Sequence, residues 1–427
     1  MLSVLDLRGV ARVDPAVFPR AAVDLDAAQA GVREIVRAVA QRGDEALAEF
    51  TSRFDGVELD PKDLRVPSEQ RAAAGAALGD DLKRAIELAA QRIRAYHTRQ
   101  LPKDWMVVEQ GSTMGEQVRA VSRAGLYAPG GRAAYPSSVL MNAIPAQVAG
   151  VESLALCSPC NAKGLVNPAI LWTADLLGIE DVYRVGGAQA IAALAYGTRT
   201  ISPVDVIAGP GNLYVAMAKR EVSGRVRVDS FAGPSEVLIL ADSTAEPRFV
   251  AADLVAQAEH DPLAACLLVT FDPSCIEAVE AALSEEIAGA RHAERARAAL
   301  AGQGAAVLVR DLDQALEVID AFAPEHLELM VPDPIGLAKR VRNAGAIFCG
   351  PYSPVAVGDY CAGSNHVLPT AGTARFSSGL SVHDFLKWTH VIAMDREALA
   401  GLAGTVSALA NAEDLPAHAR AVEVRFG

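Results

Sequence analysis

The chain lacks two features that mark proteins of nucleic acids and membranes: a basic excess and a long apolar run. In 427 residues, 39 Lys and Arg stand against 52 Asp and Glu, which gives a formal net charge of -13. Such a chain repels phosphate backbones and anionic headgroups, so we expect neither nucleic acid nor membrane as a partner. The longest apolar stretch, residues 139–157, is broken by polar residues, and charges come too early for a signal peptide. We therefore expect a cytoplasmic protein.

Cysteine is also scarce, with six in the whole chain. Six are too few for a disulfide framework of this length, and a cytoplasmic chain keeps them reduced. Cys157 and Cys160 form a lone CxxC, without the second pair that a zinc ribbon needs. A redox role is conceivable, but a turn at the end of a strand is the favoured interpretation.

No GxGxxG dinucleotide motif is present. Three other glycine-rich turns follow strand-like runs: YAPGG around Tyr127, GGAQA around Gln189 and AGPGN around Asn212. Loops that follow the strands of parallel sheets bind phosphates and rings, so these turns are candidates for a nucleotide site. Each turn taken alone is equally typical of an ordinary connection.

The order of apolar runs predicts an α/β protein of at least two domains. Residues 1–120 have helical periodicity. From residue 121, β-rich runs alternate with Ala-rich helical runs in two series, before and after Ser235. We expect two similar halves with mostly parallel sheets, and a site at the carboxyl ends of their strands. Residues 381–427 read as a small, mostly helical tail.

The segment DLVAQAEHDP is the first of three that point to a metal. It predicts a helix from Pro247 to His260, with Pro262 just beyond its end. Gln257 and His260 are three residues apart, so they share a face and could hold one ion. A helix cap or an exposed position on the surface explains the same pair.

The other two segments are VAVGDYCAGSNHVLPT and AEDLPAHAR. Glycine and proline predict an extended loop around Asp359 and His366, where a capping turn is the alternative. Glu413 and His418 lie in the tail, which otherwise reads as a solvated helix face. Such nitrogen and oxygen ligands suit a catalytic zinc better than a structural one, although manganese or cobalt would also be accepted.

The segment FAPEHLELM supplies a candidate pair of bases. Pro324 fits the first position of a helix, which would place Glu325 and His326 in its first turn. The helix dipole would then keep Glu325 ionised and His326 neutral, and two adjacent bases suit a reaction with two proton abstractions. A buried cap with a satisfied histidine is the alternative.

Nine motifs in one order make the sequence resemble the histidinol dehydrogenases over essentially its whole length. They are GLYAPGGRAAYPSSVLMNAIPA, VGGAQAIAALAYGT, GPGN, AGPSE, QAEH, APEHLEL, GDYCAGSNHVLPT, SSGLSVHDFLK and AEDLPAH. The resemblance implies a zinc-dependent, NAD-linked alcohol and aldehyde dehydrogenase. Its reaction would be the two-step, four-electron oxidation of L-histidinol to L-histidine via histidinal, the last step of histidine biosynthesis.

The resemblance also assigns roles to single residues. It implies one Zn2+ per subunit, with the ligands Gln257, His260, Asp359 and His418, the last from the partner subunit of a homodimer. NAD would contact Tyr127, Gln189 and Asn212. The substrate-binding residues would be the four zinc ligands together with Ser235, His326, His366 and Glu413. Glu325 and His326 would be the catalytic bases.

The implied fold is a pair of incomplete Rossmann-like parallel-sheet domains with small helical extensions at both termini, in a domain-exchanged homodimer. We expect an extension at residues 1–22 and a main domain from 23–126 together with 236–380. We also expect an NAD-binding domain at residues 127–235 and a tail at residues 381–427 that completes the partner's site. Two other functions stay open: a related zinc and NAD dehydrogenase of another small alcohol, and a zinc hydrolase with Glu325 as its base.

Overall fold

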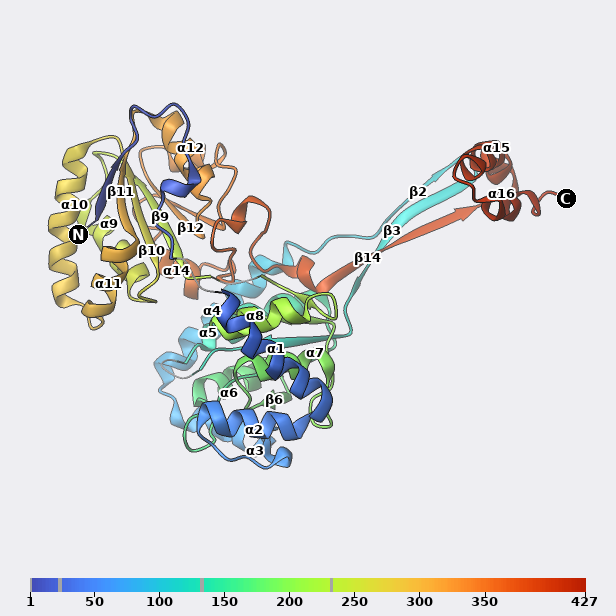
Figure 1. The fold of residues 1–427 in the computed structure, drawn as a ribbon, viewed down its shortest axis with the longest axis horizontal. Coiled ribbons are helices and arrows are strands. Elements are labelled where there is room, and N and C mark those ends of the chain that lie inside the picture. Colours follow the sequence, from blue (N-terminus) through green and yellow to red (C-terminus); the bar gives the residue numbers. More distant parts are fainter. Residues whose placement is uncertain (1, 22–24, 131–133, 231–232) are drawn as a thin grey trace.

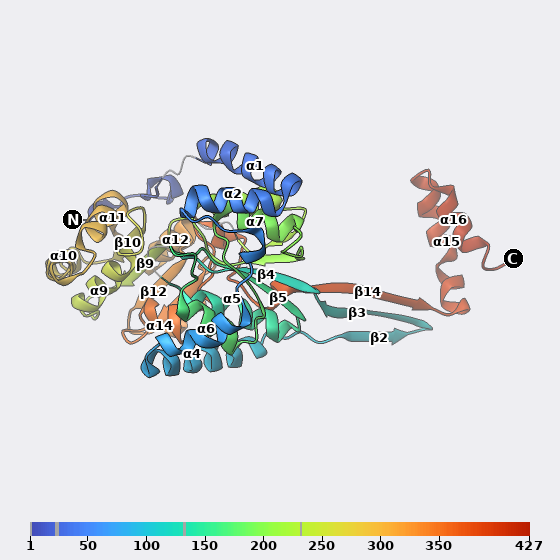
Figure 2. The same cartoon turned by 90° about the horizontal axis from the view of Figure 1, so that it is seen from below.

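The structure of the protein is a computed structural model that describes residues 2–21, 25–130, 134–230 and 233–427. Gly131 of the YAPGG turn and Ala232 of the AGPSE motif lie outside these ranges. In the described residues two parallel sheets form the body, and a third, antiparallel sheet extends away from it as an arm (Figures 1 and 2).

The larger parallel sheet has the strand order β1-β11-β10-β9-β12-β13. Its strands are β1 (Ser3–Asp6), β9 (Glu236–Ala241), β10 (Ala265–Thr270), β11 (Gly304–Leu308), β12 (His326–Met330) and β13 (Ala346–Cys349). The helices that follow in this half are α9 (Pro247–Ala258), α10 (Pro273–Gly289), α11 (Ala293–Gln303), α12 (Leu312–Phe322), α13 (Pro334–Ala338) and α14 (Val355–Tyr360).

The second parallel sheet has the order β6-β5-β4-β7-β8. Its strands are β4 (Arg123–Tyr127), β5 (Ser153–Cys157), β6 (Asp181–Tyr183), β7 (Val206–Ala208) and β8 (Arg227–Val228). Its connecting helices are α5 (Pro136–Ala149), α6 (Pro168–Leu176), α7 (Gly187–Tyr196) and α8 (Leu213–Val222). Apart from β1, the larger sheet repeats this order strand for strand, which confirms the two similar halves.

Burial explains why the central strands are mostly apolar. All residues of β9, β10, β11 and β12 are buried, as in a parallel sheet with helices on both faces. Alternate residues of β9 enter opposite cores: Val237 and Ile239 face α9, α10 and α11, whereas Leu238 and Leu240 face α12. The β-rich runs of both series expected from the sequence form strands of the two parallel sheets.

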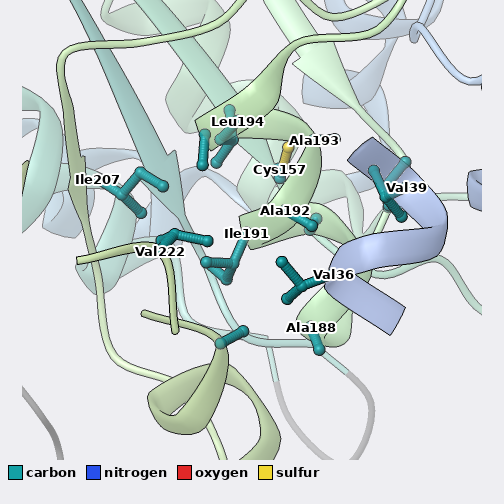
Figure 3. Packing of buried hydrophobic residues seen from close by; sticks show 14 of the residues in the cluster. Val36, Val39, Cys157, Ala188, Ile191, Ala192, Ala193, Leu194, Ile207 and Val222 are labelled. Carbon is teal, nitrogen blue, oxygen red and sulfur yellow. The ribbon is translucent and has the colours of Figure 1, made fainter. Parts of the chain in front are cut away.

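The amino-terminal helices pack on the second sheet. They are α1 (Leu25–Arg42), α2 (Asp44–Asp55), α3 (Ser68–Ala73) and α4 (Asp80–Thr98). Val36 and Val39 of α1 lie against Ala188 and Ile191 of α7 in one buried cluster (Figure 3). We therefore favour grouping residues 25–98 with the 127–235 unit, in place of grouping 23–126 with 236–380. The domain boundaries themselves stay a prediction.

The arm corrects the helical assignment of residues 1–120 and adds one strand to the tail 381–427, which is otherwise mostly helical as expected. It consists of β2 (Trp105–Glu109), β3 (Ser112–Ala120) and β14 (Leu386–Met394), in the order β14-β3-β2, and carries α15 (Arg396–Ala412) and α16 (Pro416–Glu423) at its tip (Figure 1). A hairpin turn joins β2 to β3, with positive φ at Gln110 and Gly111. The prediction missed these strands because most of their apolar side chains are exposed, so no buried face gives them a clear periodicity.

The structure also corrects the assignment of the segment FAPEHLELM. Helix α12 ends at Phe322, and Ala323 takes the left-handed conformation, with φ 48°, that closes it. His326 begins β12, which pairs with β9 and β13. The predicted helical turn at Glu325 and His326 is wrong, because the run HLELM is buried inside a sheet and Pro324 precedes a strand.

Candidate active site

One cavity of about 270 Å³ lies between the two parallel sheets and gathers seven of the residues expected from the sequence. They are Ser235, Gln257, His260, Glu325, His326, Asp359 and His366. The second sheet presents the carboxyl ends of its strands, since Pro129 and Gly209 follow β4 and β7. The larger sheet presents the opposite ends, since Ser235 precedes β9 and Glu325 precedes β12. The expected position at carboxyl ends is therefore confirmed for one sheet and wrong for the other.

The backbone of Glu236, the first residue of β9, holds both predicted bases. Its N–H donates to Oε2 of Glu325 at 2.8 Å, and its carbonyl oxygen lies 2.9 Å from Nδ1 of His326. A carbonyl oxygen only accepts, so Nδ1 of His326 carries the proton and Nε2 keeps its lone pair. Nε2 is buried without a hydrogen-bond partner among the described residues, 4.0 Å from Oδ1 of Asp359. Nε2 of His326 is therefore the basic atom of the pair.

Burial, and not a helix dipole, sets the protonation of the two bases. It lowers the pKa of His326, whose imidazole is thereby kept neutral. Burial also raises the pKa of Glu325 well above its ordinary value, and the nearby charges of Glu236 and Asp359 add to that rise. The expected helix dipole is wrong, because His326 begins a strand and Glu325 precedes it, whereas the neutral state expected of His326 agrees with its lowered pKa.

The side chain of Glu236 is anchored by Arg20, a residue that the sequence did not single out. Nε of Arg20 lies 2.7 Å from Oε1 of Glu236, and the guanidinium also donates to the carbonyl of Phe322 and covers its ring. Glu236 is 3% exposed and Arg20 25%, so the carboxylate of this ion pair is buried and the guanidinium only partly. Only the pairing of the amino-terminal segment with the larger sheet brings Arg20 there, so no local pattern could have shown it.

Three of the four proposed zinc ligands meet in the cavity. Gln257 lies in the last turn of α9, and its Nε2 is buried without a partner among the described side chains. His260, where the helix was expected to end, lies in the turn two residues beyond the observed end of α9 at Ala258. Asp359 lies in the short helix α14, which corrects the expected extended loop. No cluster of three or more His, Cys, Asp or Glu able to hold a metal is found in the part of the chain that the structure describes.

His366 closes the cavity beside Asp359. Its Nδ1 lies 2.9 Å from the backbone oxygen of Asp359, so Nδ1 is the donor, and its Nε2 lies 3.5 Å from Oγ of Ser138. Burial lowers the pKa of His366, which favours a neutral ring. A neutral ring with an available Nε2 can accept a hydrogen bond from a polar ligand.

The three residues expected at NAD are not among those that line the cavity. The hydroxyl of Tyr127, at the end of β4, accepts from the N–H of Gly187 at 3.1 Å, and burial raises the pKa of Tyr127 to about 12. Gln189 is buried in α7. Asn212 caps α8, and its Oδ1 accepts from the N–H groups of residues 214 and 215. The glycine-rich turns expected from the sequence are therefore at the ends of β4, β6 and β7.

Glu413 and His418 lie far from the cavity of their own chain. They belong to the tip of the arm, with Glu413 as the C-cap of α15 and His418 within α16 (Figures 1 and 2). Both are exposed. The structure of one chain therefore assembles the site without them.

The fold and the cavity define a class: an α/β enzyme with two like-ordered parallel sheets and a buried carboxyl–imidazole pair that faces a small polar pocket. The sequence profile of histidinol dehydrogenase matches residues 18–426. Histidinol dehydrogenase from Thermobifida fusca (strain YX) is 52% identical, over 100% of this chain and 98% of the relative. That from Nocardia farcinica (strain IFM 10152) is 53% identical, over 96% and 94%.

A solved structure agrees with these sequence matches. The crystal structure of histidinol dehydrogenase from Elizabethkingia anophelis has a TM-score of 0.95 and 34% identity, and covers 100% of this chain and 98% of the solved chain. The chain therefore belongs to the histidinol dehydrogenase family, NAD-dependent oxidoreductases of histidine biosynthesis. None of the described helices is both long and apolar enough to cross a membrane.

Proposed function

We propose that the cavity oxidises L-histidinol to L-histidine in two steps, with zinc and NAD bound and His326 and Glu325 as successive bases. The observation that carries this proposal is the anchoring of both side chains on the backbone of Glu236. It directs the lone pair of His326 Nε2 and the carboxyl of Glu325 into one cavity, where a single substrate carbon can meet each in turn.

In the first step Nε2 of His326 accepts the hydroxyl proton of histidinol as the carbinol hydride leaves. NAD, when bound, supplies the hydride acceptor. In the second step Glu325 accepts a proton from the water that adds to the aldehyde, and the hydrate, as it becomes the acid, loses a hydride to a second molecule of NAD. The raised pKa of Glu325 makes its carboxylate a stronger base than an ordinary one.

The cavity residues fit a zinc ion by the chemistry of their donor atoms. Gln257, His260 and Asp359 offer oxygen and nitrogen donors without thiolate, as catalytic zinc sites do. The amide oxygen of Gln257 would bind the zinc, because the amide nitrogen has no free lone pair; its buried Nε2, without a partner among the described residues, stays free to donate to a bound ligand. Zinc, when bound, would supply a template that holds the imidazole and amine of histidinol. The chain's own residues would then position the alcohol carbon.

The order of the second sheet supports an NAD site at the same cavity. The chain runs from β4 outward through β5 to β6, and then crosses back to β7 on the other side of β4. The switch point of the sheet therefore lies between the ends of β4 and β7. Tyr127 ends β4, and the turn that leads to Asn212 follows β7. Ligands of open α/β sheets bind at this point, which favours contacts of Tyr127, Gln189 and Asn212 with the cofactor.

We further infer a homodimer in which His418, the fourth zinc ligand, and Glu413 reach the partner's cavity. Two observations support it: these residues are remote from their own cavity, and the arm that carries them exposes large apolar side chains. Val108 is 72% exposed, Ile392 69% and Trp105 49%, which is costly for an isolated chain and is expected of a surface that a second copy covers.

The test is the number of NADH molecules formed from each histidinol, with limiting L-histidinol, excess NAD, and zinc either chelated or restored. Two NADH per histidinol, lost on chelation and recovered with zinc, is the expected result. One NADH would mean that the aldehyde is released and that Glu325 has no second step. None would favour another small alcohol as the substrate.

A further inference from the structure

A buried ion pair outside the catalytic residues joins Lys219 of α8 to Asp229, the residue after β8. Nζ of Lys219 lies 2.6 Å from Oδ1 of Asp229, and the two side chains are only 3% and 2% exposed. Burying two charges is unfavourable, and a pair of apolar side chains often stabilises a fold as well or better. Stabilisation of the fold alone therefore does not account for the pair.

Both members of the pair bind the same glycine. The N–H of Gly209 donates to Oδ2 of Asp229 at 2.7 Å, and Nζ of Lys219 donates to the carbonyl oxygen of Gly209. Gly209 has φ 128°, a conformation that side chains rarely adopt, and a Cβ at this position would lie 2.1 Å from the backbone oxygen of Tyr127. The ion pair thus holds both polar backbone groups of a residue whose conformation needs external support.

The glycine that is held begins the turn between β7 and α8. Gly209, Pro210, Gly211 and Lys219 line the same cavity as His326. The turn starts at the switch point of the second sheet and ends at Asn212, which caps α8. Its backbone is therefore part of the wall on the side where the proposed cofactor site lies.

We propose that Lys219 and Asp229 are positioning residues for NAD: they fix the turn 209–212 in the conformation that receives the dinucleotide. This inference rests on the proposed function, which places NAD at the ends of β4 and β7. An apolar pair could pack equally well but would supply neither a donor to the carbonyl nor an acceptor to the N–H of Gly209, and charged groups make both bonds stronger than neutral ones would.

The experiment compares Asp229→Asn, Lys219→Met and the double variant Lys219→Met/Asp229→Leu with the wild-type enzyme. The double variant keeps the packing and removes both charges, so it remains informative if a single variant leaves one buried charge and fails to fold. Asp181→Asn is the matched control, because Asp181 pairs with Arg123 at 2.6 Å in the same sheet, away from the cavity.

Two readouts separate positioning from a merely structural role. Hydrogen exchange of the peptide covering residues 209–212, in ligand-free protein, reports the turn directly. NAD binding by calorimetry, with the KM for NAD and kcat, reports its consequence. We expect faster exchange in this peptide and a weakening of NAD binding by roughly ten- to a hundredfold, with histidinol binding and kcat changed much less. Asp181→Asn should leave both readouts unchanged.

Unchanged exchange at residues 209–212, or loss of NAD affinity no greater than in Asp181→Asn, would overturn the inference. A folded double variant that binds NAD as the wild type does would overturn it as well. Faster exchange with unaltered NAD affinity would show that the turn is held for another purpose and would refute the cofactor role. A wild-type enzyme that binds no NAD would refute the proposed function instead, and the exchange readout would still decide whether the pair holds the turn.

Discussion

Replacing Glu325 by Gln tests which of the two oxidation steps each base serves. The amide oxygen of Gln can still accept from the N–H of Glu236, a bond of 2.8 Å in the structure, so the site should keep its shape. What is lost is a general base, whose contribution is typically about 10²–10⁴-fold in rate, or roughly 3–5 kcal/mol of barrier. We expect a loss of this size in the oxidation of histidinal and a smaller loss in the oxidation of histidinol, where His326 is the base.

The assay follows NADH from histidinol and, separately, from histidinal under single-turnover conditions. Glu317→Gln is the matched control, since Glu317 is an exposed carboxyl on the distant face of α12. If Glu325→Gln loses the same factor in both half-reactions, or keeps full activity in both, Glu325 is not the base of the second step. The reasoning from its position on the Glu236 backbone would then be refuted.

Two further predictions concern stability and assembly. Burial raises the pKa of Asp55 from 3.8 to about 6, so the folded state disfavours the ionised carboxylate. The protonated carboxyl therefore costs the folded state nothing below the unfolded pKa, and the free energy of unfolding falls as pH rises through 6. Asp55→Asn should therefore raise the free energy of unfolding by about 1–2 kcal/mol at pH 8 and by little at pH 4. The figure is discounted because the side chain is partly exposed. Thermal melts at the two pH values measure the difference. For the shared site, mixing inactive His418→Ala with inactive His260→Ala under exchange of subunits should restore about a quarter of wild-type activity, because half of the dimers are mixed and each has one intact site. A mixture that stays inactive would count against a partner-supplied His418.

Local sequence gave a reliable account of the elements whose pattern reflects complete burial. The runs EVLILA and ACLLVT are apolar at every position except Glu236 and Thr270, because both faces of their sheet are covered, and this is visible without the fold. Helix α9 was likewise expected from Pro247 onward, and its end came two residues before the predicted one at His260.

Elements without such a pattern were missed or misassigned. The run HLELM was too short to separate a buried strand from a helix, and Pro324 suggested the wrong one of the two. The arm strands β2, β3 and β14 expose many apolar residues in one chain, so their sequence carries no burial signal. The two positive φ angles at Gln110 and Gly111 belong to a turn that the glycine could have indicated.

By itself the sequence determined which residues could do the chemistry, since side-chain type and motif order single out Glu325, His326 and the proposed ligands. The tertiary structure decided what those residues can do. It brought Arg20 and the backbone of Glu236 beneath the two bases, oriented Nε2 of His326 into the cavity, and carried His418 to the tip of an arm. Periodicity records only neighbours along the chain, whereas a catalytic site depends on contacts between segments hundreds of residues apart, such as the one between Arg20 and Glu236.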